Sequence, residues 1–164
     1  MKTTLLVLLA GFGVMAVLAA EKSTEKSSSM KEEHVLLNMA DVQWTEAPPS
    51  LPPGAQFAVL QGNPAKVGVY TVRLKVPSGY KIPPHTHPTT ENVSVISGTM
   101  SFGMGDTFDD SKGTQITAGG FASMPAHMQH YAWSTGDTVL QVHGQGPFRI
   151  DYVNPTDDPR HAKK

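Results

Sequence analysis

The sequence of 164 residues contains no cysteine. Disulfide bonds, thiolate metal ligands and cysteine nucleophiles are therefore excluded. The lipid anchor of a bacterial lipoprotein is attached to a cysteine, so no such anchor is expected either. A fold of this composition must be stabilised by its core, by its strand pairing and by any metal that it binds.

Aromatic residues are scarce, at 7%, and neither sign of charge dominates, with 13 Lys and Arg against 14 Asp and Glu. A nucleic-acid-binding surface would show an excess or a stripe of basic residues, so this class of function is not expected. The chain also lacks long runs of helix-forming residues, whereas it has 15 glycines and 13 prolines. Many turn residues between short apolar segments favour an all-β fold.

The first twenty residues have the pattern of a signal peptide. Lys2 precedes an apolar stretch from Leu5 to Leu18, and Ala19 and Ala20 provide small residues for cleavage. The alternative is a membrane anchor, but the run is short for a span of about 20 apolar residues. We therefore expect cleavage after residue 20, a periplasmic or secreted protein, and no membrane anchor once the signal is removed.

The rest of the chain divides into three parts. Residues 21–37 begin with the polar tract EKSTEKSSSMKEE, which has too few apolar residues to pack and predicts a disordered linker. Residues 38–155 form the predicted folded domain, and residues 156–164 a C-terminal tail. Residues 38–45 are expected to be an arm or a first strand.

Short apolar or alternating segments recur through the predicted domain. In the clearest of them, Val72, Leu74 and Val76 share one face of an extended strand and the polar residues between them share the other. Eight such segments with turn residues between them suggest a jelly roll. The predicted strands cover residues 56–60, 69–76, 91–97, 99–104, 121–124, 130–133, 138–143 and 148–153.

Two histidines lie two positions apart in the segment GYKIPPHTHPTTENVSVISG, residues 79–98. On an extended strand, alternate residues project to the same side, so the imidazoles of His85 and His87 can reach one ion. A hairpin after them would bring the carboxylate of Glu91 beside both rings. His130 is the best candidate for a fourth ligand from a neighbouring strand. Together these residues predict a site for one divalent transition metal, among Fe, Mn, Ni, Co, Cu and Zn.

This segment resembles the first motif of the cupin family, G-x5-H-x-H-x3–4-E-x6-G, at each fixed position, and the second motif, G-x5-P-x-G-x2-H-x3-N, is matched in part. The matching residues are Gly79, His85, His87, Glu91 and Gly98 for the first motif, and Gly119, Pro125 and His130 for the second. His127 replaces the usual glycine and Ser134 the usual asparagine of the second motif. The resemblance extends over residues 38–154 and implies a single-domain cupin jelly-roll β-barrel, similar to exported cupins whose activity is usually unassigned.

Resemblance to quercetinase-like cupins implies a metal-dependent oxygenase that acts on a small oxygenated or aromatic compound. Glu91 would then be a catalytic residue as well as a ligand, since a carboxylate that detaches from the ion can accept a substrate proton. Two alternatives stay open, namely a metal-dependent isomerase or lyase and a non-catalytic sensor that binds a small molecule. The expected partner is a small molecule in each case, and a homodimer is left open as the assembly.

Three further residues are candidates for the lining of a substrate pocket. His127 lies either at the barrel mouth, as an acid or base, or simply in a turn, and the turn is the favoured interpretation. Gln141 and His143 share one face of a late strand. Val139 lies on their face and Leu140 and Val142 on the other, so the sequence leaves open which face is turned inward.

Overall fold

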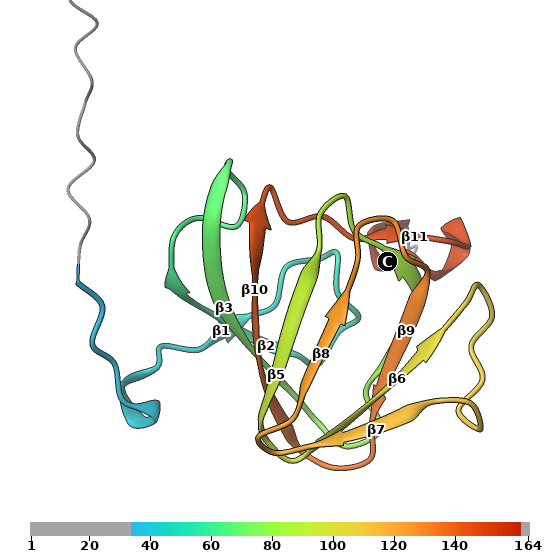
Figure 1. Ribbon diagram of the computed structural model, residues 1–164, viewed down its shortest axis with the longest axis horizontal. Coiled ribbons are helices and arrows are strands. Elements are labelled where there is room, and N and C mark those ends of the chain that lie inside the picture. The colour runs from blue at the N-terminus through green and yellow to red at the C-terminus, as the bar shows by residue number, and fades with distance from the viewer. Residues whose placement is uncertain (1–33, 162–164) are drawn as a thin grey trace, which may run out of the picture. The chain divides into compact units, whose positions relative to one another are not determined.

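The computed structural model describes residues 34–161, and its regular secondary structure is almost entirely strand (Figure 1). The predicted signal peptide and most of the predicted linker lie outside these residues, and residues 34–37 are exposed. The strands are β1 (Thr45–Glu46), β2 (Gln56–Gln61), β3 (Gly68–Val76), β4 (Lys81–Thr86), β5 (Glu91–Ser97), β6 (Thr99–Met104), β7 (Thr114–Thr117), β8 (Phe121–Met124), β9 (His130–Ser134), β10 (Thr138–Gly146) and β11 (Asp151–Tyr152). Short 3₁₀ turns are η1 (Met39–Asp41), η2 (Pro155–Asp157) and η3 (Pro159–His161).

The strands form two antiparallel sheets, which confirms the predicted all-β jelly roll. One sheet has the order β1-β2-β3-β10-β5-β8 and the other the order β11-β4-β9-β6-β7. In Figure 1, β3, β10, β5 and β8 run side by side, as their hydrogen-bonded ladders require. Within the described residues, the ladders do not join the two sheets into one closed sheet. The metal-site candidates come from both sheets, so the packing between the sheets determines the site.

Alternating side chains from both sheets form one buried core. Val72, Leu74 and Val76 of β3 are buried, as their spacing predicts, and the first two lie opposite Val142 and Leu140 of β10. The second sheet contributes buried side chains to the same core, among them Ile82, Met100 and Phe102. Burial of this apolar surface is the main stabilising contribution in a domain without disulfides.

Some strands differ from the predicted ones. β7 was not predicted, because its sequence TQIT has one apolar residue and therefore no alternation to detect. The predicted strand over residues 148–153 is reduced to β11, Asp151–Tyr152. The backbone N–H of Phe148, just after Pro147, donates to the carbonyl of Pro64 instead of to a neighbouring strand. Residues 38–45 contain the turn η1 and only the first residue of β1.

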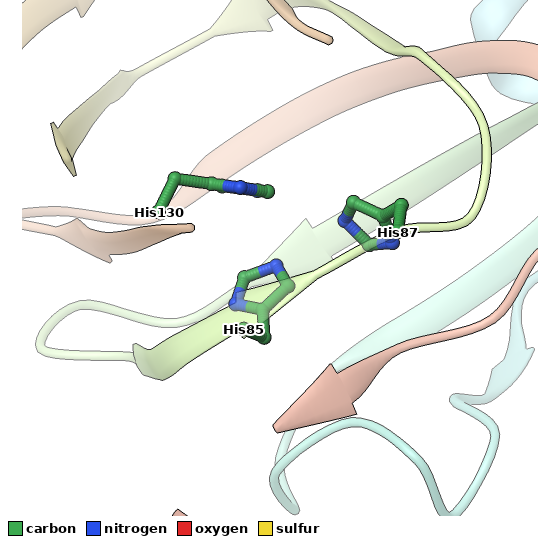
Figure 2. A group of neighbouring side chains, drawn as sticks. All are labelled: His85, His87 and His130. Atoms are coloured by element: carbon green, nitrogen blue, oxygen red, sulfur yellow. The ribbon is translucent and has the colours of Figure 1, made fainter. Parts of the chain in front are cut away.

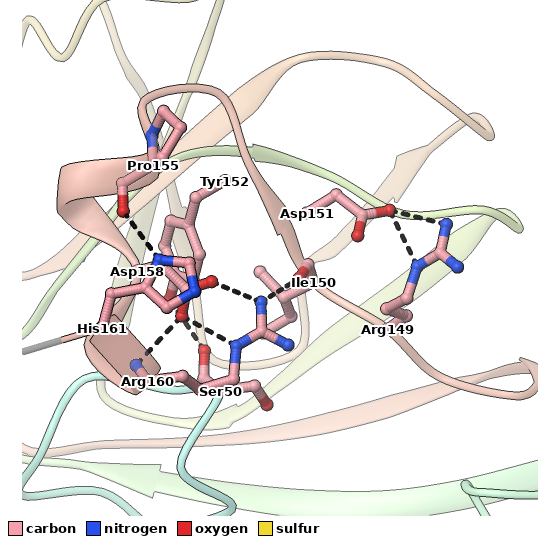
Figure 3. A network of polar contacts seen from close by, with 9 residues as sticks. All are labelled: Ser50, Arg149, Ile150, Asp151, Tyr152, Pro155, Asp158, Arg160 and His161. Carbon is pink, nitrogen blue, oxygen red and sulfur yellow. Dashed lines mark hydrogen bonds and ion pairs between the residues drawn. The ribbon is translucent and has the colours of Figure 1, made fainter.

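The C-terminal residues hold the segment around β11 in place (Figure 3). Arg160 pairs with Asp158, a buried carboxylate, at 2.6 Å and also donates to the backbone oxygen of Ile150 at 3.1 Å. Tyr152 donates its hydroxyl hydrogen to the backbone oxygen of Ser50. These bonds fix residues 149–152, which lie against two of the histidines described below.

No helix in the described residues is long and apolar enough to cross a membrane.

Candidate metal centre

A bulge in β4 aims His85 toward β9. Ile82 lies opposite Ala132 of β9, but three positions later His85 lies opposite His130, so β4 contains one extra residue. The two residues at this irregularity are Pro83 and Pro84, which have no N–H to donate and are tolerated in strands at such interruptions. The segment IPPH therefore shifts the register and makes His85 and His130 direct cross-strand neighbours.

The other candidate residues are placed by the ends of three strands. His87 follows the last residue of β4, Thr86, and remains on the same side of the chain as His85. Glu91 is the first residue of β5, where it lies beside Gly144 of β10. His130 is the first residue of β9. The predicted hairpin connection between His87 and Glu91 thus brings the carboxylate back to the histidines.

The three imidazoles converge on one point (Figure 2). The ring centroids of His85 and His130 are 4.2 Å apart, and His87 lies 4.9 Å from the first and 5.2 Å from the second. One nitrogen from each ring lies within 4.8 Å of the others, which is a separation that a single ion can bridge. All three side chains are buried.

Each ring makes one hydrogen bond through Nδ1 to a backbone carbonyl. His85 donates to the oxygen of Pro83 at 2.7 Å, and His87 donates to that of Arg149 at 2.7 Å. The corresponding bond from His130 to Met128 is 3.0 Å long. Because a carbonyl can only accept, Nδ1 carries the hydrogen and a neutral ring has its lone pair on Nε2. This orientation through a second hydrogen bond is typical of histidines that bind metals.

The Nε2 atoms of His87 and His130 are buried without a hydrogen-bond partner among the described residues. The nearest charge is on Glu91, whose Oε2 lies 3.5 Å from Nε2 of His87 and 3.6 Å from Nε2 of His130. An unsatisfied buried polar atom costs about 1–3 kcal/mol. A cation between these atoms would satisfy both nitrogens, so the donor set fits a metal ion.

Burial and mutual proximity give the ionisable groups different proton affinities. Burial, followed by the neighbouring His130 and His87, lowers the pKa of His85 to about 3, so His85 is neutral near pH 7. Burial also acts to lower the pKa of His87, but the negative charge of Glu91, together with the hydrogen bond to Arg149 and the charge of Asp151, outweighs it and raises that pKa. Burial acts to raise the pKa of Glu91, yet His87 and His130 hold it well below its usual range. Glu91 is therefore ionised.

The four residues line a cavity of about 40 Å³ between the two sheets. A cavity needs about 10–15 Å³ for each water molecule, so this one accommodates about three water-sized groups. Its other lining residues are all apolar: Leu51, Phe57, Val72, Leu74, Ile82, Val93, Met100, Phe102, Ala132, Leu140, Val142, Phe148 and Ile150. Among the described lining residues, the three histidines and Glu91 are thus the only titratable groups.

The remaining candidates lie outside this cavity. Leu140 and Val142 of β10 line it, so Gln141 and His143, which alternate with them, project from the opposite face of the sheet. His143 lies instead in a shallow surface groove. The sequence left this orientation open, and the structure shows that neither residue lines the metal-site cavity.

His127 is exposed and occupies a turn with φ 63°, which is the left-handed conformation that glycine adopts most easily. This conformation explains why a glycine is usual at the corresponding motif position. The backbone N–H of His127 donates to the carbonyl of His87 at 2.8 Å, so the turn supports the site through its main chain. The imidazole is not among the cavity-lining side chains.

The sequence did not indicate one lining residue, Phe148. Its ring stacks on His87 with a centroid distance of 5.2 Å and an interplanar angle of 27°. It belongs to the connection between β10 and β11, which is 61 positions from His87 and carries no motif. Only the fold brings the two rings together, so neither spacing nor periodicity could have found this contact.

Comparison with known proteins identifies the family. The family described as ChrR cupin-like domain matches residues 32–149. Among curated proteins, germin-like protein 5-1 of Oryza sativa subsp. japonica is 36% identical over 77 residues. That match covers 46% of this chain but only 35% of the germin-like protein, so most of the relative has no counterpart in the match.

Two solved structures share the fold. The polyketide cyclase RemF from Streptomyces resistomycificus has a TM-score of 0.64 at 15% identity, with 77% of this chain and 90% of that chain covered. A candidate acetylacetone dioxygenase from Methylibium petroleiphilum PM1 has a TM-score of 0.60 at 20% identity, with 80% and 88% covered. At such low identity the likeness is one of fold, which many different activities share.

Proposed function

The chain belongs to the ChrR cupin-like domain family, and on that premise we propose that it binds one divalent transition-metal ion through His85, His87, Glu91 and His130. The observation that supports this most strongly is that two buried Nε2 atoms, on His87 and His130, have no hydrogen-bond partner among the described residues. They face the third imidazole and an ionised carboxylate in an otherwise apolar cavity. A bound cation accounts for all four groups at once.

The donor set is three nitrogens and one carboxylate. Such ligands suit Fe, Mn, Ni, Co, Cu or Zn, and ligand identity does not select among them. When bound, the ion would supply a Lewis acid and open coordination positions for small ligands. The chain itself orients the ligands: the three Nδ1–H groups are held by backbone carbonyls, so each Nε2 lone pair is directed inward before any ion arrives.

We further propose that the centre is an oxygenase that acts on a small oxygenated compound. The apolar lining supports this choice over an isomerase or lyase. An isomerase or lyase needs groups that deliver and remove protons at different substrate atoms. Apart from the histidines, whose roles as ligands require them to be neutral, the described lining residues offer only Glu91 for that task. An apolar lining suits a reaction with dioxygen, which is itself apolar.

Glu91 is the proposed proton acceptor. Its side chain is 12% exposed, so it connects the cavity with solvent and can take up a proton from a substrate hydroxyl at Oε2. The charge of His87 is the main contribution that keeps the pKa of Glu91 low in the metal-free protein. With an ion bound, Glu91 would have to detach from it before it could accept this proton, because a coordinated carboxylate oxygen is a weaker base than a free one.

The amino-terminal sequence supports export as part of the proposal. An apolar stretch after Lys2, small residues at Ala19 and Ala20, and the polar sequence that follows are typical of a cleaved signal peptide. The proposed site of action is therefore the periplasm or the medium. Mass spectrometry of protein recovered from these fractions tests this, and a mature chain that still begins at Met1 would contradict it.

Metal analysis followed by oxygen consumption tests the activity. Protein purified from its native compartment is assayed for metal content and then mixed with small hydroxy and keto compounds in an oxygen electrode. We expect oxygen uptake that requires the metal, is lost in His130→Ala and is kept in His143→Ala, whose imidazole lies outside the cavity. Conversion at the same rate without oxygen would indicate an isomerase or lyase, and metal-dependent binding without conversion would indicate a sensor.

A further inference from the structure

The cavity opens to solvent at two residues. Of the described residues that line it, all are buried except Glu91 and Phe148. A ligand that travels from solvent to the Nε2 atoms must therefore pass between a carboxylate and an aromatic ring. Glu91 is placed by the start of β5 and its paired strands. Phe148 lies in a connection outside the strands, between β10 and β11.

The ring of Phe148 covers the histidine nearest the mouth. It stacks on His87, which is only 3% exposed, and packs edge-on against Tyr70 with centroids 5.8 Å apart. The backbone of Phe148 is held by a hydrogen bond from its N–H to the carbonyl of Pro64. The next residue, Arg149, accepts the Nδ1–H of His87 through its carbonyl. The position of the ring is therefore tied to the position of a proposed ligand.

With the ring in this position, the space beside the histidines is small. The cavity of about 40 Å³ holds about three water-sized groups, whereas an apolar cavity that binds benzene measures about 150 Å³. The walls apart from the mouth are core side chains of the two sheets, such as Val72, Met100 and Leu140, whose displacement would disrupt packing. Phe148 is the apolar lining residue that is not enclosed by the core.

We propose that Phe148 determines the size of the ligands that reach the metal centre. Because the ion itself takes part of this space, the ring restricts the centre to ligands of a few non-hydrogen atoms at most, such as dioxygen or a small oxygen donor, and excludes aromatic compounds. This inference rests on the proposed function, since it presupposes a bound ion, and it narrows the substrate class to the smallest oxygenated compounds. Phe148 acts by occupying space, so it is a specificity-determining residue.

Ligand binding to the cobalt-loaded protein tests the inference without any turnover. The visible absorption of bound Co(II) changes when a new ligand coordinates, so two probes of different size can be titrated: azide, with three atoms, and 4-phenylimidazole. Azide should bind wild type and Phe148→Ala with similar affinity. 4-Phenylimidazole should bind Phe148→Ala about tenfold or more tightly than wild type. Phe148→Leu, which keeps most of the bulk, should behave like wild type.

Phe121→Ala is the matched control, because Phe121 is 54% exposed and does not line the cavity. It should bind both probes as wild type does. Equal affinity of wild type and Phe148→Ala for 4-phenylimidazole, with cobalt bound and azide binding intact, would overturn the inference and leave the metal site standing. Failure of wild type to bind cobalt would instead overturn the proposed function. If Phe148→Ala does not fold, Phe148→Val takes its place, because it enlarges the mouth with a smaller loss of side-chain volume. Its affinity for 4-phenylimidazole is then compared with that of wild type in the same way.

Discussion

Replacing His87 with alanine removes one proposed ligand and three contacts of the metal-free protein. The imidazole donates to the carbonyl of Arg149, stacks on Phe148 and lies beside the carboxylate of Glu91. From the sequence alone, this substitution is expected to leave the metal-free fold nearly unchanged, because polar groups in a cavity are not there for packing. The structure predicts instead that the free energy of unfolding of the metal-free protein falls by about 1–3 kcal/mol, because the variant loses packing and a partly buried hydrogen bond.

The effect on metal binding should be larger than the effect on the fold. Free metal at about 100 times its dissociation constant stabilises the folded state by about 2.7 kcal/mol. For a domain of this size, each kcal/mol raises the Tm by about 4 °C, so metal should raise the wild-type Tm by about 10 °C. If loss of His87 weakens the affinity about 100-fold, the same metal concentration stabilises the variant by only about 0.4 kcal/mol, or about 2 °C.

Thermal melts with chelator and with metal measure both effects. Wild type, His87→Ala and His143→Ala are compared, the last because it removes an imidazole that lies outside the cavity. The metal-dependent rise should be nearly lost in the first variant and retained in the second. If His87→Ala gains as much from metal as wild type does, the ion is bound elsewhere and the proposed ligand set is wrong.

Three further predictions concern charge, pH and backbone conformation. Glu91→Gln keeps the shape of the side chain but removes the anion, so metal affinity measured by calorimetry should fall about tenfold or more; an unchanged affinity would contradict its role as a ligand. The pKa of His85 is lowered to about 3 by burial first, so below about pH 6.5 the unfolded chain binds a proton that the folded chain does not. On acidification, His85 alone should lower the free energy of unfolding of the metal-free protein by about 1.4 kcal/mol per pH unit. The effect of His87 has the opposite sign: because its pKa is raised in the folded state, it contributes stability that is lost as pH rises. Urea denaturation in chelator should therefore show a smaller acid-induced loss for His85→Leu than for wild type, and equal losses would refute the sign. Finally, Gly98 and Gly119 both have positive φ, but a Cβ would overlap neighbouring atoms only at Gly98. Gly119→Ala should lower the free energy of unfolding, measured by urea denaturation, by about 1–2 kcal/mol and Gly98→Ala by about 3 kcal/mol. Equal losses in the two variants would contradict this ranking.

The spacing of the motif residues predicted the cluster because short-range geometry determines most of it. His85 and His87 lie two positions apart at the end of β4, where alternate residues of an extended segment project to the same side, and both line the cavity. Likewise, the strict alternation of Val72, Leu74 and Val76 predicted their burial, because only one face of the strand can meet the core.

The orientation of β10 could not be predicted, because apolar residues lie on both of its faces. Val139 is buried, and so are Leu140 and Val142 on the other face. The extra residue at the irregularity beside Val139 belongs to β5, whereas the pairing of β10 with β3 is unbroken. Both faces of β10 are therefore covered near Val139, and a strand that is apolar on both faces is compatible with either placement of Gln141.

Contacts with the main chain and with distant loops were also beyond the sequence pattern. The three carbonyls that orient the imidazoles belong to Pro83, Met128 and Arg149, and any residue type supplies a carbonyl. Phe148 resembles any other aromatic residue until the fold places it on His87. Such contacts depend on the relative placement of both sheets, which local spacing does not specify.

The most direct test of the metal centre is anomalous diffraction from crystals of the metal-loaded protein. The account predicts one strong peak per chain, about 2.0–2.2 Å from the Nε2 atoms of His85, His87 and His130 and from a carboxylate oxygen of Glu91. A peak at another position, or a structure in which His130 turns away from an occupied site, would contradict it.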